Sequence, residues 1–269
     1  MSVQLFLDVY NEYWEVAQTK TSSKCKLLTY EYELEKSLSH FYDSMENEYT
    51  RELLNAINQF ASEINSIVIW ESVISKYNED EQFELRYEFL KLPLFYCINQ
   101  PRAIKDRFIF CTAHLCNQAN NLFKDQKDDL PEDYKIRVKH FENKVSVWDS
   151  ATALINALDN LASQSYINDT KNYRNMSHHS IPANFDHGHT NFITRTPNHV
   201  DTQKYISIED GKEVVTEKTF RGTSYGFGGL EPLLTKDLIP IFIRECENAQ
   251  TAFKAYWDLV LEHQSYKVD

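Results

Sequence analysis

Apolar residues recur at helical spacing through most of the chain. One stripe lies within residues 53–68 and a second within residues 104–122, and each places its apolar side chains three or four positions apart, as on the buried face of a helix. A broader apolar face extends over residues 133–165 and predicts one long helix there. A last stripe predicts a closing helix over about residues 235–264. Most of the chain is therefore expected to be a string of helices.

Prolines mark the expected boundaries of these helices. Pro93 and the segments 99–101 and 128–131 each bring in a proline, whose ring fixes the local backbone and removes an N–H donor. We expect each of the three to stop one helix or to start the next.

The helical part is expected to close with a short polar helix. Residues 166–170 are expected to interrupt the helices, with Asp169 or Thr170 capping the helix that follows. That helix is expected to contain residues 173–177 and to end before Pro182, because a proline disfavours helical geometry in the residue before it.

The pattern then changes, and all six glycines of the chain lie in the part that follows. Residues 204–209 alternate between apolar and polar, residues 210–211 are Asp-Gly, which favours a two-residue turn, and residues 212–220 continue with strand-forming residues. This pattern predicts a β-hairpin. Residues 192–195 are expected to add a third strand, because three short strands are more stable than two. The glycine-rich residues 225–229 are expected to form a flexible connection.

Together the elements predict a mainly α protein with a small β-hairpin inserted before the C-terminal helix. We expect a single domain over residues 1–269. Its parts are a helical body over about residues 1–182, a loop and hairpin insertion over about 183–234, and the closing helix over about 235–264. Contents of 42% hydrophobic and 13% aromatic residues suit a globular chain.

The cysteines and the hydropathy of the chain indicate the cellular compartment that we expect. The five cysteines are odd in number and form no Cys-x-x-Cys pair, so we expect buried thiols rather than a disulfide framework or a zinc ribbon. No run of about 18 uninterrupted apolar residues occurs, and residues 1–10 lack the basic start and apolar core of a secretion signal. These features favour the cytoplasm and argue against a membrane.

The net charge of -12 argues against broad affinity for nucleic acid, which depends on clustered Lys and Arg. The charge is unevenly distributed, however. Residues 171–221 contain seven basic and six acidic residues, for a net +1, so the remainder carries -13. Five of the nine histidines also lie in this window. Any RNA is therefore expected to bind locally, within this part of the chain.

The candidate chemistry lies in residues 173–179, which read YRNMSHH. Arg174 can clamp and neutralise a phosphate with its fixed fork of donors, and His179 carries a group suited to proton transfer near neutral pH. The two are five positions apart, about 140° around a regular helix, so their side chains converge only if the last turn loosens at residues 180–182. This segment indicates cleavage of RNA.

The order Arg174-Asn175-x-x-x-His179 resembles the signature of the HEPN superfamily, the higher eukaryotes and prokaryotes nucleotide-binding domains. The resemblance implies an HEPN-like helical bundle that acts as a homodimeric, metal-independent endoribonuclease without a cofactor. Two copies of the motif are then expected to face each other across the subunit interface. The resemblance further implies RNA, possibly tRNA, as substrate, a bacterial defence or toxin-like role, and a cognate antitoxin or defence partner.

In this hypothesis each motif residue has a role. Arg174 stabilises charge that develops on the phosphate oxygens, His179 moves a proton at the ribose 2'-hydroxyl or the leaving 5'-oxygen, and Asn175 orients the substrate. An aromatic ring beside the motif can also stack on a base. The candidate substrate-binding residues are Lys171, Tyr173 and His178.

Two other interpretations remain open. In the first, the chain is a catalytically silent helical protein that binds a nucleotide or a partner through the same cleft, and its cations only complement the dipole at a helix C-terminus. In the second, a metal-dependent enzyme uses loop side chains that have the ligand chemistry of zinc or nickel, although their spacing matches no established site. Those side chains are His178, His179, Asp186, His187 and His189.

Overall fold

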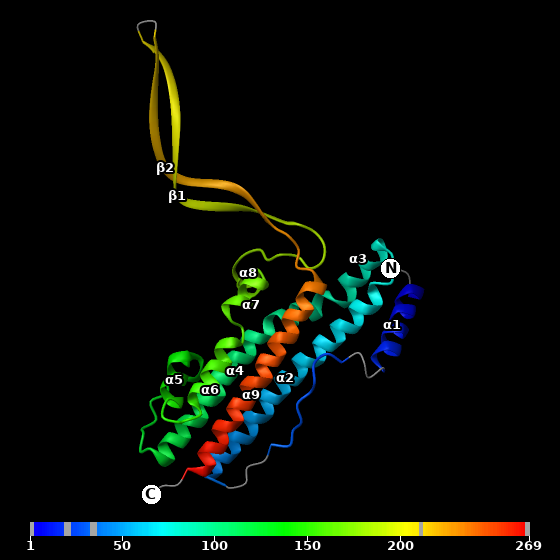
Figure 1. Cartoon of the computed structure of the whole chain (residues 1–269), viewed down its shortest axis with the longest axis vertical. Coiled ribbons are helices and arrows are strands. Elements are labelled where there is room, and N and C mark those ends of the chain that lie inside the picture. Colours follow the sequence, from blue (N-terminus) through cyan, green and yellow to red (C-terminus); the bar gives the residue numbers. More distant parts are fainter. Residues whose placement is uncertain (1–2, 19–22, 33–36, 210–211, 267–269) are drawn as a thin grey trace.

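A bundle of long helices makes up most of the structure, and a β-hairpin projects from one end of it (Figure 1). The centre consists of α2 (His40–Ile74), α4 (Lys91–Phe123) and α9 (Thr235–Ser265), and each of these helices contacts the other two. The prediction of a mainly helical protein with a hairpin before the C-terminal helix is confirmed. The computed structural model describes residues 3–18, 23–32, 37–209 and 212–266.

Shorter helices cover this centre. Within the described ranges, no helix combines the length and apolar character needed to cross a membrane. The remaining helices are α1 (Val3–Ala17), α3 (Glu79–Phe89), the 3-10 helix Asp133–Lys135, α5 (Val138–Val145), α6 (Ala151–Asn160), α7 (Gln164–Asp169) and α8 (Tyr173–His179).

The predicted apolar stripes form the core of the bundle. The side chain of Ser39 caps α2 by accepting a hydrogen bond from the backbone N–H of Tyr42. The predicted closing helix is confirmed as α9, which buries Leu238, Phe242 and other apolar residues against α2 and α4. All five cysteines are buried free thiols, as expected. The buried stripe of α2 includes Leu53, Ile57, Phe60, Ile64 and Ile67.

Of the three predicted proline boundaries, the one at residues 99–101 is wrong. Helix α4 passes through Pro101, although a proline inside a helix removes one hydrogen bond and costs about 3 kcal/mol. Pro101 is buried in a long apolar face that packs on α2 and α9, and this packing outweighs the local cost. Pro93 lies in the first turn of α4, where no N–H partner is needed, and the segment 128–131 lies in a loop, both as predicted.

The single long helix predicted over residues 133–165 is also wrong, because this segment is divided among the 3-10 helix Asp133–Lys135, α5, α6 and the start of α7. The carboxylate of Glu262 in α9 accepts hydrogen bonds from the backbone N–H groups of Asp149 and Ser150, at 2.8 and 2.9 Å, between α5 and α6. Glu245 of α9 accepts the N–H of Ala162, at 2.8 Å, where the backbone turns to a positive φ of 51°. These N–H groups thus donate hydrogen bonds to carboxylates distant in sequence, whereas in a continuous helix they would donate to backbone carbonyls.

The predicted interruption at 166–170 is largely helical, since α7 covers most of it. Neither predicted residue caps α8: Asp169 is the last residue of α7, and Thr170 follows it with its hydroxyl donating to the carbonyl of Tyr166. The break falls at Lys171 and Asn172, which both have left-handed backbones, with φ of 51° and 53°. The short helix itself is present as α8, which begins after Asn172 and ends before Pro182 as predicted.

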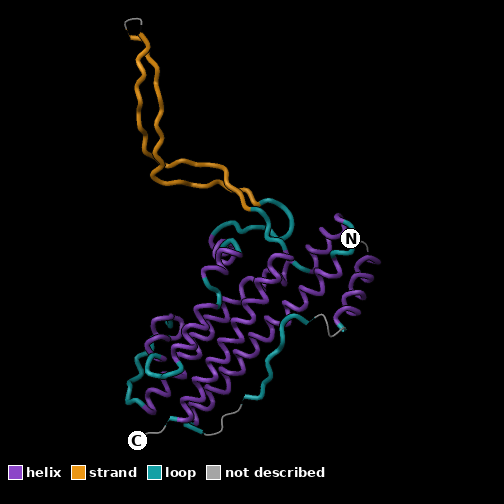
Figure 2. The backbone as a smooth tube through the Cα atoms, viewed as in Figure 1, coloured by secondary structure: helices purple, strands orange, loops and turns teal. Residues whose placement is uncertain are grey.

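The hairpin is longer than predicted and has two strands in its sheet. Strands β1 (Thr190–Glu209) and β2 (Lys212–Leu230) pair in antiparallel register, with a bulge between Thr196 and His199, and extend away from the helices (Figure 2). The expected third strand at 192–195 is wrong, because these residues begin β1. The expected flexible connection at 225–229 is wrong too, because these residues pair with β1. The predicted turn at 210–211 lies outside the described residues.

Candidate functional site

Helix α8, which carries the Arg-Asn-x-x-x-His motif, lies at the end of the bundle from which the hairpin projects (Figure 1). Tyr173 anchors it. The ring of Tyr173 is buried, stacks on Phe185 with centroids 4.9 Å apart, and meets the edge of Phe95 at 6.3 Å. Burial raises the pKa of its hydroxyl. One face of this short helix is therefore fixed to the body, and the rest is free to carry polar groups.

Arg174 and Asn175 are exposed and line a cavity of about 230 Å³, which we call the arginine cavity. The guanidinium of Arg174 makes no hydrogen bond or ion pair with any described residue. Arg102 of α4 lines the same cavity and pairs with Asp106 at 3.1 Å, in a pair that is open to solvent. Two guanidinium groups and one carboxylate therefore give the cavity a net positive lining, which suits an anion. Its other lining residues are Ala162, Tyr166, Ile167, Thr170 and Asn172.

The two histidines of the motif lie on the last turn of α8. His178 and His179 are both exposed, with ring centroids 6.4 Å apart, and neither lines the arginine cavity. The last turn does not loosen, because the N–H of Ser180 donates to the carbonyl of Met176 as in a regular helix. The structure therefore brings Arg174 and Asn175 together and leaves His179 about 140° away around the helix.

Lys171 has a structural contact of its own. Its ammonium donates to the backbone carbonyls of Glu231, at 2.9 Å, and Pro232, at 3.4 Å. These carbonyls directly follow β2, so Lys171 ties the turn before α8 to the base of the hairpin. A substrate phosphate has to compete with these bonds for the ammonium.

The loop side chains proposed as metal ligands do not gather. Asp186 accepts hydrogen bonds from the backbone N–H and the hydroxyl of Thr235, at 2.8 and 2.6 Å, and lies 3.4 Å from Arg86. His187 packs against the ring of Phe83, and His189 lies by the end of β2. Within the described part of the chain, no three His, Cys, Asp or Glu side chains lie close enough together to hold a metal ion.

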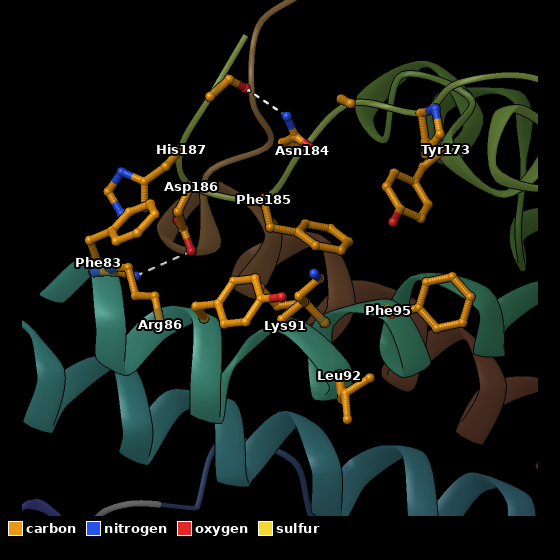
Figure 3. Close-up of a pocket in the computed structure, with 15 residues that line it drawn as sticks. Phe83, Arg86, Lys91, Leu92, Phe95, Tyr173, Asn184, Phe185, Asp186 and His187 are labelled. Atoms are coloured by element: carbon orange, nitrogen blue, oxygen red, sulfur yellow. Dashed lines mark hydrogen bonds and ion pairs between the residues drawn. The ribbon is translucent and has the colours of Figure 1, made fainter. Parts of the chain in front are cut away.

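A second and larger cavity is lined by Tyr173. It has a volume of about 610 Å³ and opens between the helices α3 and α4 and the loop of residues 182–188 (Figure 3). We call it the aromatic trough; its main lining residues are Phe83, Tyr87, Lys91, Phe95, Tyr173 and Phe185. The sequence predicted nothing here, although four of these residues recur at intervals of four, a signal that marks one face of a helix.

No family model matches this chain, and neither a curated protein nor a solved structure matches it. The HEPN resemblance therefore depends on the motif in residues 173–179 and on the helical body around it.

Proposed function

We propose that this protein is a metal-independent endoribonuclease of the HEPN type that cleaves RNA at the surface of α8. The observation that carries the proposal is the exposed guanidinium of Arg174, which has no partner among the described residues. It shares the arginine cavity with Asn175 and Arg102. An arginine without a carboxylate partner, in a cavity with a second arginine, is suited to hold a phosphate.

The chemistry uses the ribose hydroxyl of the RNA itself. His179 takes the proton of the 2'-hydroxyl or delivers one to the leaving 5'-oxygen, and Arg174 stabilises the charge on the phosphate oxygens. Asn175, beside Arg174 in the same cavity, orients the substrate. Removing the guanidinium of Arg174 or the imidazole of His179 is expected to lower the rate on the order of a hundredfold or more. DNA, which lacks the 2'-hydroxyl, is expected to be inert.

A homodimer is required for this chemistry. Arg174 and His179 of one chain diverge around α8, so His179 of the partner subunit has to complete the site at Arg174. Such an arrangement has two identical sites related by a two-fold axis. The resemblance adds the expectations of tRNA as a possible substrate, a cytoplasmic defence or toxin-like role, and a cognate antitoxin or defence partner.

The divergence of Arg174 and His179 within one chain also favours a second candidate. A catalytically silent protein could bind a nucleotide or a partner through the arginine cavity without any need for His179.

Incubation of the purified protein with a tRNA mixture in EDTA separates the two. We expect cleavage by the wild-type chain and a loss of at least a hundredfold in Arg174→Ala and in His179→Ala. Arg51→Ala and His40→Ala, which change exposed residues of α2 outside residues 171–221, are the matched controls and should stay active. Absence of cleavage by the wild-type chain would favour the silent protein, and cleavage only with added metal would overturn both.

A further inference from the structure

The aromatic trough is built on a stripe of four residues. Phe83, Tyr87, Lys91 and Phe95 recur at intervals of four across the junction of α3 and α4. The helical hydrogen bonds continue through Leu90, whose N–H donates to the backbone carbonyl of Arg86 and whose carbonyl accepts from the N–H of Leu94. The stripe therefore stays on one side of the helical path and forms the floor of the cavity (Figure 3).

The floor exposes large aromatic rings to solvent. Phe83 is 52%, Tyr87 62% and Phe95 44% exposed. Single exposed rings are common on protein surfaces, but rings that share one concave surface mark a binding site. The volume of about 610 Å³ lies in the range of small-ligand pockets.

Two ring contacts join this floor to the opposite wall. At one end His187 meets Phe83, with centroids 5.1 Å apart. At the other end Tyr173 meets Phe95 at 6.3 Å and stacks on Phe185. Figure 3 shows Tyr173 pointing its hydroxyl into the space between these ends. The wall is itself fixed, because the N–H of Asp186 donates to the carbonyl of Leu233, at 2.9 Å, just before α9. The trough is thus preformed.

Of the two cations that line the trough, Arg86 is already paired with carboxylates. Arg86 is committed to Glu71, at 2.8 Å, and to Asp186, at 3.4 Å. Lys91 makes no ion pair with any described residue, and its ammonium lies 4.2 Å from the ring centre of Tyr87. Lys91 is therefore the lining cation that can meet an anionic group, in a chain whose net charge is -12. A flat ring against the aromatic residues and a negative group at Lys91 together match a nucleotide.

We propose that the aromatic trough binds one unpaired nucleotide, with its base against the rings of Tyr87, Phe95 and Phe185 and its phosphate at Lys91. The choice of RNA as the source of that nucleotide rests on the proposed nuclease function. Tyr173 and Arg174 are adjacent in α8 and open into the trough and into the arginine cavity. A single strand that crosses α8 can therefore place a base in the first and a phosphate in the second.

Binding can be measured without cleavage. The protein carries Arg174→Ala throughout, and the probe is a fluorescently labelled single-stranded RNA of about ten nucleotides, whose anisotropy is followed in EDTA. In this background Tyr87→Ala is expected to weaken binding about tenfold, since one base stacked on an aromatic ring contributes about 1–3 kcal/mol. Tyr87→Phe should retain it. Lys91→Gln should weaken binding and reduce its dependence on salt.

The chain offers a matched control pair outside the trough. Tyr134 is 72% exposed, and the ammonium of Lys135 lies 5.1 Å from its ring centre, the same kind of contact as that between Tyr87 and Lys91. Tyr134→Ala and Lys135→Gln should leave the affinity unchanged. Circular dichroism of each variant checks that these exposed substitutions leave the helices intact.

Two competition experiments show whether the bound nucleotide is free or part of an RNA strand. If AMP or UMP displaces the probe at concentrations similar to the unlabelled strand, the trough holds a free nucleotide. If only the strand displaces it, the trough holds a segment of RNA; both results support the proposal. A duplex of the same sequence should compete weakly, because its bases are already paired and stacked.

The proposal is overturned if Tyr87→Ala and Lys91→Gln bind as tightly as their controls, or if neither the strand nor the mononucleotides bind. Failure of the nuclease proposal has a different signature. In that case the wild-type chain binds the strand with the same dependence on Tyr87 and Lys91 but leaves the tRNA uncut.

Discussion

Tyr173 and Arg174 are consecutive residues of α8, yet their side chains line different cavities. Tyr173 is buried against Phe185 in the aromatic trough, whereas Arg174 is exposed in the arginine cavity. Consecutive side chains of a helix point about 100° apart, so a short helix set between two cavities presents one residue to each. In the proposed function, base recognition and phosphate chemistry would lie on separate sides of one helical turn.

Mixing two inactive variants tests whether the nuclease site is shared between subunits. Arg174→Ala and His179→Ala are each expected to be inactive in tRNA cleavage. A dimer of one of each keeps one site in which Arg174 of one chain meets the intact His179 of the partner subunit. After subunit exchange, activity should therefore recover to about a quarter of the wild-type value. Differently tagged subunits that co-purify without recovering activity would contradict a shared site.

Replacement of Glu262 by alanine is expected to destabilise the folded protein at the connection between α5 and α6. Its carboxylate accepts the backbone N–H groups of Asp149 and Ser150, and Glu262→Ala leaves both without that acceptor. We expect a loss of roughly 1–3 kcal/mol in the free energy of unfolding, measured by urea denaturation. Glu247→Ala, an exposed residue of the same helix, is the control and should have little effect. Equal losses in both variants would show that Glu262 does not hold this break.

Acid is expected to weaken the fold through His263. This buried ring shares a hydrogen bond of 2.7 Å with the hydroxyl of Tyr42, and burial lowers its pKa from 6.5 to about 3, an effect that Glu262 opposes. The unfolded chain therefore takes up a proton below about pH 6.5 that the folded chain excludes. The free energy of unfolding should fall with decreasing pH, by at most about 1.4 kcal/mol per pH unit from this group.

The variant His263→Gln isolates this contribution. An amide can keep a hydrogen bond to Tyr42 but does not titrate. We expect the variant to be less stable than the wild type at pH 7.5 and to lose less stability between pH 7 and pH 5, measured by urea denaturation at each pH. Parallel losses in the two proteins would exclude His263 as the source.

Glu46 is expected to lower the stability of the fold as the pH rises, the opposite of the effect of His263. Its carboxylate is buried, with one oxygen accepting from the hydroxyl of Thr50 at 2.7 Å and the other without a partner among the described residues. Burial raises its pKa. The folded state therefore holds this proton to a higher pH than the unfolded state does, and the group costs stability once the pH exceeds the ordinary value of 4.5.

Replacement of Glu46 by glutamine should remove that cost. The difference in melting temperature between Glu46→Gln and the wild type is expected to be larger at pH 8 than at pH 5, by a few degrees for a change of roughly 1 kcal/mol. Glu142→Gln, at an exposed position of α5, provides the comparison. A difference that does not vary with pH would count against a buried charge at Glu46.

The local spacing of apolar residues was sufficient to predict the three long helices. The stripes at 53–68, 104–122 and 235–264 predicted α2, α4 and α9, because burial of an apolar face dominates the energetics of a long helix. The same logic failed at 133–165, where the apolar positions are compatible with one helix. Glu262 and Glu245 lie about a hundred positions further along the chain, and no local pattern reveals that they accept N–H groups there.

The sequence predicted the β-hairpin, but its strands are longer than predicted. The alternation at 204–209 marked the distal part, but the glycines at 225–229 resembled a loop. Pairing with the start of β1 places them in a strand, and pairing between distant segments is a tertiary property.

For the candidate site, the sequence by itself determined the chemical groups: the residue types at Arg174, Asn175 and His179, and their spacing along one helix. The tertiary structure alone decided which groups share a cavity. It brought Arg102 from α4 to Arg174, engaged Lys171 with the carbonyls that follow β2, and assembled the aromatic trough from the α3–α4 junction, α8 and the loop before β1. The physical reason is that composition and helical period act over a few residues, whereas a cavity is formed by surfaces that meet only when the chain packs.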